Sequence, residues 1–128
     1  MQPRVLVVDD DADILALIRE ALLFHGYQVD TVSDGQAALD RIDQARPDLL
    51  LLDIRMPGMD GYDVIRHLKA DESTHNIPII VITASSVDKE RDRVRVLGMA
   101  ADQYMTKPLS IAGLILEIKK AIADGVSG

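Results

Sequence analysis

The sequence predicts a doubly wound α/β domain, with a five-stranded parallel sheet and helices on both faces. Two observations predict this fold. Short continuous apolar runs alternate along the chain with segments whose apolar residues recur at helical spacing. The runs lack the polar alternation of a half-exposed strand, so each is expected to be covered on both sides, as in a parallel sheet. Five strand–helix units with right-handed crossovers then place helices on both faces.

The expected strands are four to six residues long, and three of the five consist almost entirely of aliphatic side chains. Val5–Val8 is the first, and the four consecutive leucines Leu49–Leu52 form the third, which is the most continuous apolar run of the five. The fifth is the weakest. The complete set covers residues 5–8, 27–32, 49–52, 78–82 and 101–105.

The expected helices each carry one apolar face. The first begins after Asp11, which is interpreted as its N-cap, and ends before Gly26, a residue favoured just beyond a helix C-terminus. The second is capped near Ser33 or Asp34 and stops before Pro47. The five helices are expected within residues 14–22, 37–42, 64–68, 87–97 and 111–122.

Composition limits the possible classes of protein. The 128 residues, 48% hydrophobic and 27% charged, suit one globular domain. The formal charge of −7 disfavours direct binding to nucleic acid or to an anionic membrane. Because the chain has no Cys, disulfide scaffolds and thiolate metal sites are excluded. No apolar run approaches the length of a membrane span, and the first residues do not resemble a signal peptide, so a cytoplasmic protein is expected.

Polar side chains follow the buried runs. Asp9 and Asp10 follow the first strand, Asp53 the third, Thr83 the fourth and Lys107 the fifth. The carboxyl ends of parallel strands share one edge of the sheet, so these groups should lie together. Clustered carboxylates repel by about 4 kcal/mol per pair at close range, which favours a bound cation, and oxygen ligands favour Mg²⁺. The ammonium and hydroxyl groups suit a phosphoryl group.

These residues and their spacing carry a resemblance. The segments Asp9–Asp10, Asp53–Gly61, Thr83–Ala84 and Tyr104–Pro108 together resemble the receiver domain of bacterial two-component response regulators. The likeness runs from Val5 to about residue 123. It implies a flavodoxin-like receiver domain over residues 3–123, with 124–128 as a tail or the start of a linker.

The resemblance implies a phosphoryl site on the third strand. Asp53 would be the phosphoacceptor in a Mg²⁺-dependent reaction, with Mn²⁺ as a substitute ion. Asp9, directly or through water, Asp10, Asp53 and the backbone carbonyl of Arg55 would hold the metal. Arg55 and Ser85 would tune the lifetime of the phosphoryl group. The chain would accept and lose this group without being an enzyme for another substrate.

The resemblance also implies a conformational switch. Lys107 would pair with a phosphoryl oxygen, Thr83 would hydrogen-bond the phosphoryl group, and Tyr104 would turn inward. A cis peptide would join Lys107 and Pro108. The remodelled face would be the fourth helix, fifth strand and fifth helix, within residues 87–123.

The partners follow from the same likeness. A sensor histidine kinase or histidine phosphotransfer protein would donate the phosphoryl group, and an output protein or fused output domain would read the remodelled face. The chain would be a monomer or a phosphorylation-dependent dimer. A stand-alone regulator and the amino-terminal part of a longer protein both fit.

Other readings of Asp53 are weaker. In isolation this residue could simply form a turn ahead of Pro57–Gly58. A haloacid-dehalogenase-type phosphatase also places an Asp after a buried strand, but it needs a second acid two positions later, where this chain has Arg55. A flavin carrier of similar topology needs a phosphate-binding loop where the first acids stand.

Overall fold

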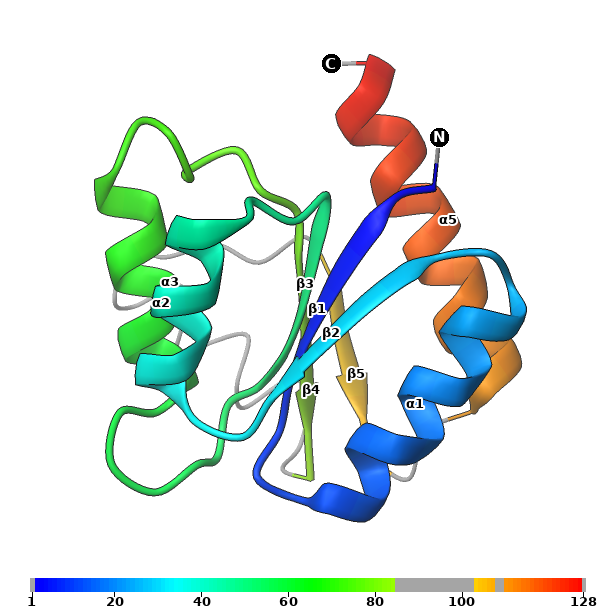
Figure 1. The fold of residues 1–128 in the computed structure, drawn as a ribbon, viewed down its shortest axis with the longest axis horizontal. Helices are drawn as coiled ribbons and strands as arrows, with labels where there is room; N and C mark the ends of the chain where they lie inside the picture. The colour runs from blue at the N-terminus through cyan, green and yellow to red at the C-terminus, as the bar shows by residue number, and fades with distance from the viewer. Residues whose placement is uncertain (1, 85–102, 108–109, 128) are drawn as a thin grey trace.

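A computed structural model of the chain describes residues 2–84, 103–107 and 110–127 (Figure 1). The expected helix at 87–97, Ser85 and Pro108 lie outside the described residues. Within them the chain forms five parallel strands in one sheet, ordered β2-β1-β3-β4-β5. The strands are β1 Arg4–Val8, β2 Gln28–Val32, β3 Leu49–Asp53, β4 Ile79–Thr83 and β5 Gln103–Thr106. The predicted doubly wound sheet is therefore confirmed.

Helices cover both faces of the sheet. In the described part of the chain these are α1 Ala12–Phe24, α2 Gly35–Gln44, α3 Gly61–Ala70 and α5 Ile111–Ser127. Figure 1 shows α2 and α3 on one side of the sheet and α1 and α5 on the other. This arrangement explains the continuous apolar runs, because every residue of β3 and β4 is buried, whichever face it points to.

The sheet separates two apolar cores. Alternate strand residues such as Leu50 and Leu52 pack with side chains of α2 and α3, including Leu68. Their neighbours, such as Leu51, pack on the other side with Ile18 of α1 and residues of α5. The period-two alternation of a strand thus sends adjacent leucines into different cores.

The helix ends match the sequence prediction. Asp11 Oδ1 accepts hydrogen bonds from the backbone of Asp13 and Ile14 at 2.9 and 3.3 Å, so Asp11 is the N-cap of α1. Asp34, rather than Ser33, caps α2. These side chains satisfy backbone N–H groups that the first turn of a helix leaves without a partner.

Some boundaries differ from the sequence analysis. β3 and β4 extend by one residue to include Asp53 and Thr83, since the ladder bonding continues to the Asp53–Ile82 and Thr83–Thr106 pairs. α5 continues through Gly125 to Ser127, past the boundary expected at residue 123. Extending an existing helix fixes one residue per added hydrogen bond, which is easier than starting one, so a glycine near the end is tolerated.

The chain turns from β3 into α3 through a tightly packed glycine. The Gly61 backbone N–H donates to the Ile54 carbonyl at 3.1 Å and closes the intervening loop. A Cβ at position 61 would lie 2.7 Å from Ile54 Cα and 2.8 Å from the Asp53 carbonyl oxygen. Both neighbours are backbone atoms, so a side chain here forces the end of β3 to move.

We predict that Gly61→Ala destabilises the domain by about 1–3 kcal/mol, the usual cost of overpacking. The measurement is the free energy of unfolding from urea titrations. Gly113→Ala in α5 is the matched control, because its Cβ would meet only ordinary contacts, the nearest at 3.5 Å. There the loss of a helical glycine should stabilise the domain by about 0.5–1 kcal/mol. Equal stabilities for the two variants would contradict the close-packing explanation.

Candidate phosphoacceptor and metal site

The site lies where the strand order reverses, between β1 and β3. From β1 the chain proceeds to one edge strand, and from β3 it proceeds towards the other, and open α/β sheets commonly bind ligands at the carboxyl ends of such a pair. Val8 is in register with Leu52. Asp9, just after β1, and Asp53, the last residue of β3, therefore lie at the same level, and both residues are buried, with exposed fractions of 1% and 3%.

Lys107 joins the two buried carboxylates. Its Nζ lies 2.8 Å from Asp9 Oδ2 and 3.4 Å from Asp53 Oδ2. The shorter contact is an ion pair whose alignment is poor for a hydrogen bond, so Asp9 Oδ2 accepts no well-directed hydrogen bond among the described residues. The backbone N–H of Lys107 donates to the Thr83 carbonyl at 2.8 Å, which ties the lysine to the end of β4.

Backbone amides orient the other carboxylate oxygens. Asp53 Oδ1 accepts from the N–H of Arg55 at 3.0 Å, and Asp9 Oδ1 accepts from the N–H of Asp11 at 2.9 Å. Each side chain is thus held by the loop that follows its own strand. The Oδ2 atoms of both residues then face the lysine.

The environment changes the acidity of the pair. Burial raises the pKa of Asp53 to about 6, and the nearby Asp9 charge adds to this, while the Arg55 amide and Lys107 oppose it. Burial alone would lower the pKa of Lys107, but its contacts with Asp9 and Asp53 outweigh burial and raise it. The lysine therefore stays charged, and the Asp53 carboxyl takes up a proton as the pH falls through about 6.

The donor set fits a hard divalent cation. Asp9, Asp10 and Asp53 each offer a carboxylate oxygen, and these oxygens lie within 4.8 Å of one another. Asp10 is exposed, so an ion could enter from solvent on that side. Among the described residues, the buried Asp9 Oδ2 has the Lys107 ammonium group as its ion-pair partner and no well-directed hydrogen bond, which leaves this oxygen able to bind a cation. Oxygen-only ligands with open water positions suit Mg²⁺.

The expected switch residues lie in β4 and β5. Thr83, at the end of β4, is fully buried, and Tyr104 in β5 is partly buried against the core on the α2 and α3 side. The register Val81–Tyr104 and Thr83–Thr106 places the two strands side by side. The structure thus brings together Asp9, Asp10, Asp53, Thr83 and Lys107, as predicted.

One contact in the site is not among the sequence-based predictions. The resemblance implies that Lys107 pairs with a phosphoryl oxygen, whereas in the structure this lysine pairs with Asp9 as well as Asp53. The signal was available, because two buried acids at adjacent strand ends need a nearby cation. The predictions for Ser85 and for the cis peptide at Pro108 concern residues outside those described.

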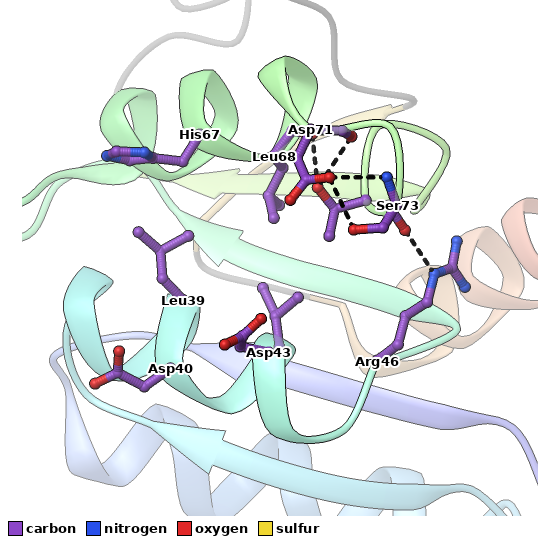
Figure 2. Close-up of a pocket in the computed structure, with 10 residues that line it drawn as sticks. Leu39, Asp40, Asp43, Arg46, His67, Leu68, Asp71 and Ser73 are labelled. Carbon is purple, nitrogen blue, oxygen red and sulfur yellow. Dashed lines mark hydrogen bonds between the residues drawn. The ribbon is translucent and has the colours of Figure 1, made fainter.

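A separate cavity lies between α2 and α3 and contains none of the predicted site residues. Figure 2 shows this cavity of about 450 Å³, which is lined by Leu39, Asp43 and Leu68 among others. At its edge Arg46 Nε donates to the Ser73 carbonyl at 3.2 Å. The candidate site is not identified by a cavity. It is recognised by its buried charges instead.

The fold and this cluster define a receiver-type α/β domain. Comparison with known proteins gives the same answer: residues 5–119 match the family described as response regulator receiver domain. The chain belongs to this family. Its fold and its place in two-component signalling are those of a response regulator receiver domain.

Known relatives agree with this assignment. The transcriptional regulatory protein PrrA of Mycobacterium leprae is 44% identical over 118 residues, which is 91% of this chain and 48% of PrrA. The receiver domain of a Syntrophus aciditrophicus signal transduction histidine kinase is 34% identical, with a TM-score of 0.85 over 95% of this chain and 91% of that one. Vibrio cholerae CheY4 is 26% identical, with a TM-score of 0.86 over 94% and 99%.

The chain spans about half the length of the curated relatives it matches. Among the described residues, none of the helices combines the length and the apolar character needed to cross a bilayer.

We predict a pH-dependent stability that Asp53→Asn removes. The folded-state pKa of Asp53, about 6, exceeds the ordinary value of 3.8, so its protonated form stabilises the fold at low pH. That contribution is complete below about pH 3.8 and is lost as the pH rises through 6. Without metal, Asp53→Asn should therefore melt at a temperature higher than wild type by about 3 °C or more at pH 8, and the difference should shrink towards pH 4.

The measurement is circular dichroism melting in EDTA across this pH range. Asp71→Asn is a control in which the expected change in melting temperature has the opposite sign. The backbone and side chain of Ser73 hydrogen-bond to Asp71 and lower its pKa, so its carboxylate stabilises the fold above pH 3.8. That variant should melt below wild type at pH 8. A constant difference between Asp53→Asn and wild type at all pH values would contradict the assignment.

Proposed function

We propose that Asp53 accepts a phosphoryl group from a histidine kinase or a histidine phosphotransfer protein, and that the modified domain controls an output partner. One observation carries this proposal. Asp53 is a buried carboxylate whose Oδ1 is held by the Arg55 amide and whose Oδ2 lies 3.4 Å from an ammonium group. A carboxylate held in this way presents an oriented oxygen to an incoming phosphorus atom.

The chemistry is an exchange at phosphorus. An Asp53 carboxylate oxygen attacks the phosphorus of a phosphohistidine, a P–O bond forms and the P–N bond breaks. The imidazole leaves with the bonding electron pair and takes a proton from solvent. Asp53 becomes an acyl phosphate. Because its pKa is about 6, the carboxyl is mostly ionised at neutral pH and available as a nucleophile.

Asp9, Asp10, Asp53 and the Arg55 carbonyl would hold Mg²⁺ next to the reacting oxygens. When bound, the ion neutralises charge that builds on the phosphoryl oxygens. Lys107, which directly follows β5, supplies a second positive charge. Its contact with Asp9 keeps it near Asp53 before the phosphoryl donor binds. The chain itself acts as the acceptor, and it turns over no other substrate.

The output would follow from new contacts at the ends of β4 and β5. A phosphoryl group on Asp53 offers acceptor oxygens to the Thr83 hydroxyl and to Lys107, and both residues adjoin β5. Contacts made in only one conformation shift the balance between two conformations. Tyr104, partly buried in β5, is the side chain we expect to move inward. The surface of β5 and α5, together with the helix that the sequence predicts at residues 87–97, would then bind the output partner or promote dimerisation.

The first test is the intact mass after incubation with acetyl phosphate and Mg²⁺. We expect wild type to gain one phosphoryl group, and EDTA or the Asp53→Asn substitution to prevent the gain. Asp71→Asn, an exposed Asp far along the chain, should behave as wild type. An equal gain in Asp53→Asn would contradict the phosphoacceptor assignment. Failure of wild type with both acetyl phosphate and a phosphorylated histidine phosphotransfer protein would contradict the proposed function.

A second test addresses the metal. Mg²⁺ at 100 times its dissociation constant should stabilise the folded wild type by about 2.7 kcal/mol. Asp10→Asn should lose most of this gain, yet match wild type in EDTA, because Asp10 is exposed. Asp13→Asn, an exposed acid in the first turn of α1, is the matched control and should keep the full gain. The measurement is urea unfolding with and without Mg²⁺, and equal gains in both variants would contradict the ligand set.

A further inference from the structure

The first residue of α2 lies unusually close to the loop that follows the phosphoacceptor. A Cβ built on Gly35 would lie 2.6 Å from the backbone oxygen of Met59 and 2.9 Å from its Cγ. Gly35 is buried, and its φ is not in the left-handed region. The backbone conformation thus allows any residue at position 35, and the approach of Met59 excludes a side chain.

The loop in question spans residues 54–60 and bears on Asp53 directly. At its start the Arg55 N–H donates to Asp53 Oδ1, and at its end Gly61 N–H donates back to the Ile54 carbonyl. These contacts come from the same strand–loop–helix unit. Gly35 belongs to a different unit, β2–α2, so its contact with Met59 anchors the loop to the rest of the domain.

We propose that Gly35 is a positioning residue: its lack of a side chain lets the loop 54–60 seat against the start of α2, which sets the place of the Arg55 backbone beside Asp53. This inference rests on the proposed function, since it concerns the site that would bind Mg²⁺ and accept the phosphoryl group. The shortest approach, 2.6 Å, is to a backbone oxygen, and the other two are to Met59 Cγ and Cβ, so a methyl group at position 35 displaces the loop itself and not only the Met59 side chain.

The expected effect is on metal affinity more than on the fold. Mutation of a residue that supports a metal ligand typically lowers the affinity for the metal about 10–100-fold. Gly35→Ala should weaken Mg²⁺ binding by about 10-fold. Helix propensity alone would favour alanine at this first helical position, so a purely local view predicts an equal or more stable protein with unchanged Mg²⁺ binding.

The experiment measures Mg²⁺ binding to the full chain by isothermal titration calorimetry, together with the Arg55 amide shift in metal-free ¹H–¹⁵N spectra. We expect Gly35→Ala to raise the dissociation constant about 10-fold and to move the Arg55 amide resonance. Gly113→Ala, the glycine-to-alanine control in α5, should change neither. Met59→Ala should bind Mg²⁺ within about twofold of wild type, because the Met59 backbone oxygen keeps its place.

The double variant Gly35→Ala/Met59→Ala guards against a Gly35→Ala protein that does not fold. It removes the 2.9 Å contact with Cγ but leaves the 2.6 Å contact with the backbone oxygen, so it should still bind Mg²⁺ more weakly than wild type. Wild-type affinity and an unmoved Arg55 amide in either alanine-35 variant would overturn the inference while leaving the proposed function intact. A wild type that binds no Mg²⁺ would overturn the proposed metal site, and this inference with it.

Discussion

The arrangement of the domain depends on the side-by-side placement of two buried carboxylates at the ends of β1 and β3. The register of these strands puts Asp9 beside Asp53, and the surrounding sheet removes both from water. Two such charges cannot stay close without compensation. Lys107 supplies part of it, and this requires β5 to end at the same edge. The need to place a positive charge beside two buried carboxylates therefore accounts for the strand order and for the position of β5.

The charges of the site do not cancel. In the part of the chain that the structure describes, Asp9, Asp10 and Asp53 cluster together and one ammonium group, that of Lys107, contacts two of them, so these four groups carry a charge of −2 when all are ionised. A protein selected for stability alone would be better served by fewer acids. The excess negative charge is explained if a cation binds at the site. It also agrees with the raised pKa of Asp53, since burial and the Asp9 charge disfavour the ionised form of this carboxyl.

Much of this could be predicted from the sequence, because the signals are local or topological. Apolar runs such as Leu49–Leu52 identify the strands, and a parallel topology alone brings Asp53 and Lys107 to one edge. Caps such as Asp11 depend on a few adjacent residues. The close approaches at Gly35 and Gly61 could not be predicted, since they depend on the distance between backbones of different segments. The pairing of Lys107 with both Asp9 and Asp53 was within reach of the sequence, since two buried acids at adjacent strand ends need a nearby cation, and only its distances depend on side-chain geometry.

The two cores on either side of the sheet have a consequence for how the sequence can vary. Leu50 and Leu51 are adjacent in the chain, yet each belongs to a separate packing cluster. Substitutions that share no contacts usually act independently. Side chains in one core can therefore change in volume and shape during evolution, and the compensating substitutions are confined to the pair of helices that covers that face of the sheet. The layer that carries the carboxylates stays in place between them, so lineages can diverge widely in their aliphatic residues while the reactive edge keeps its geometry.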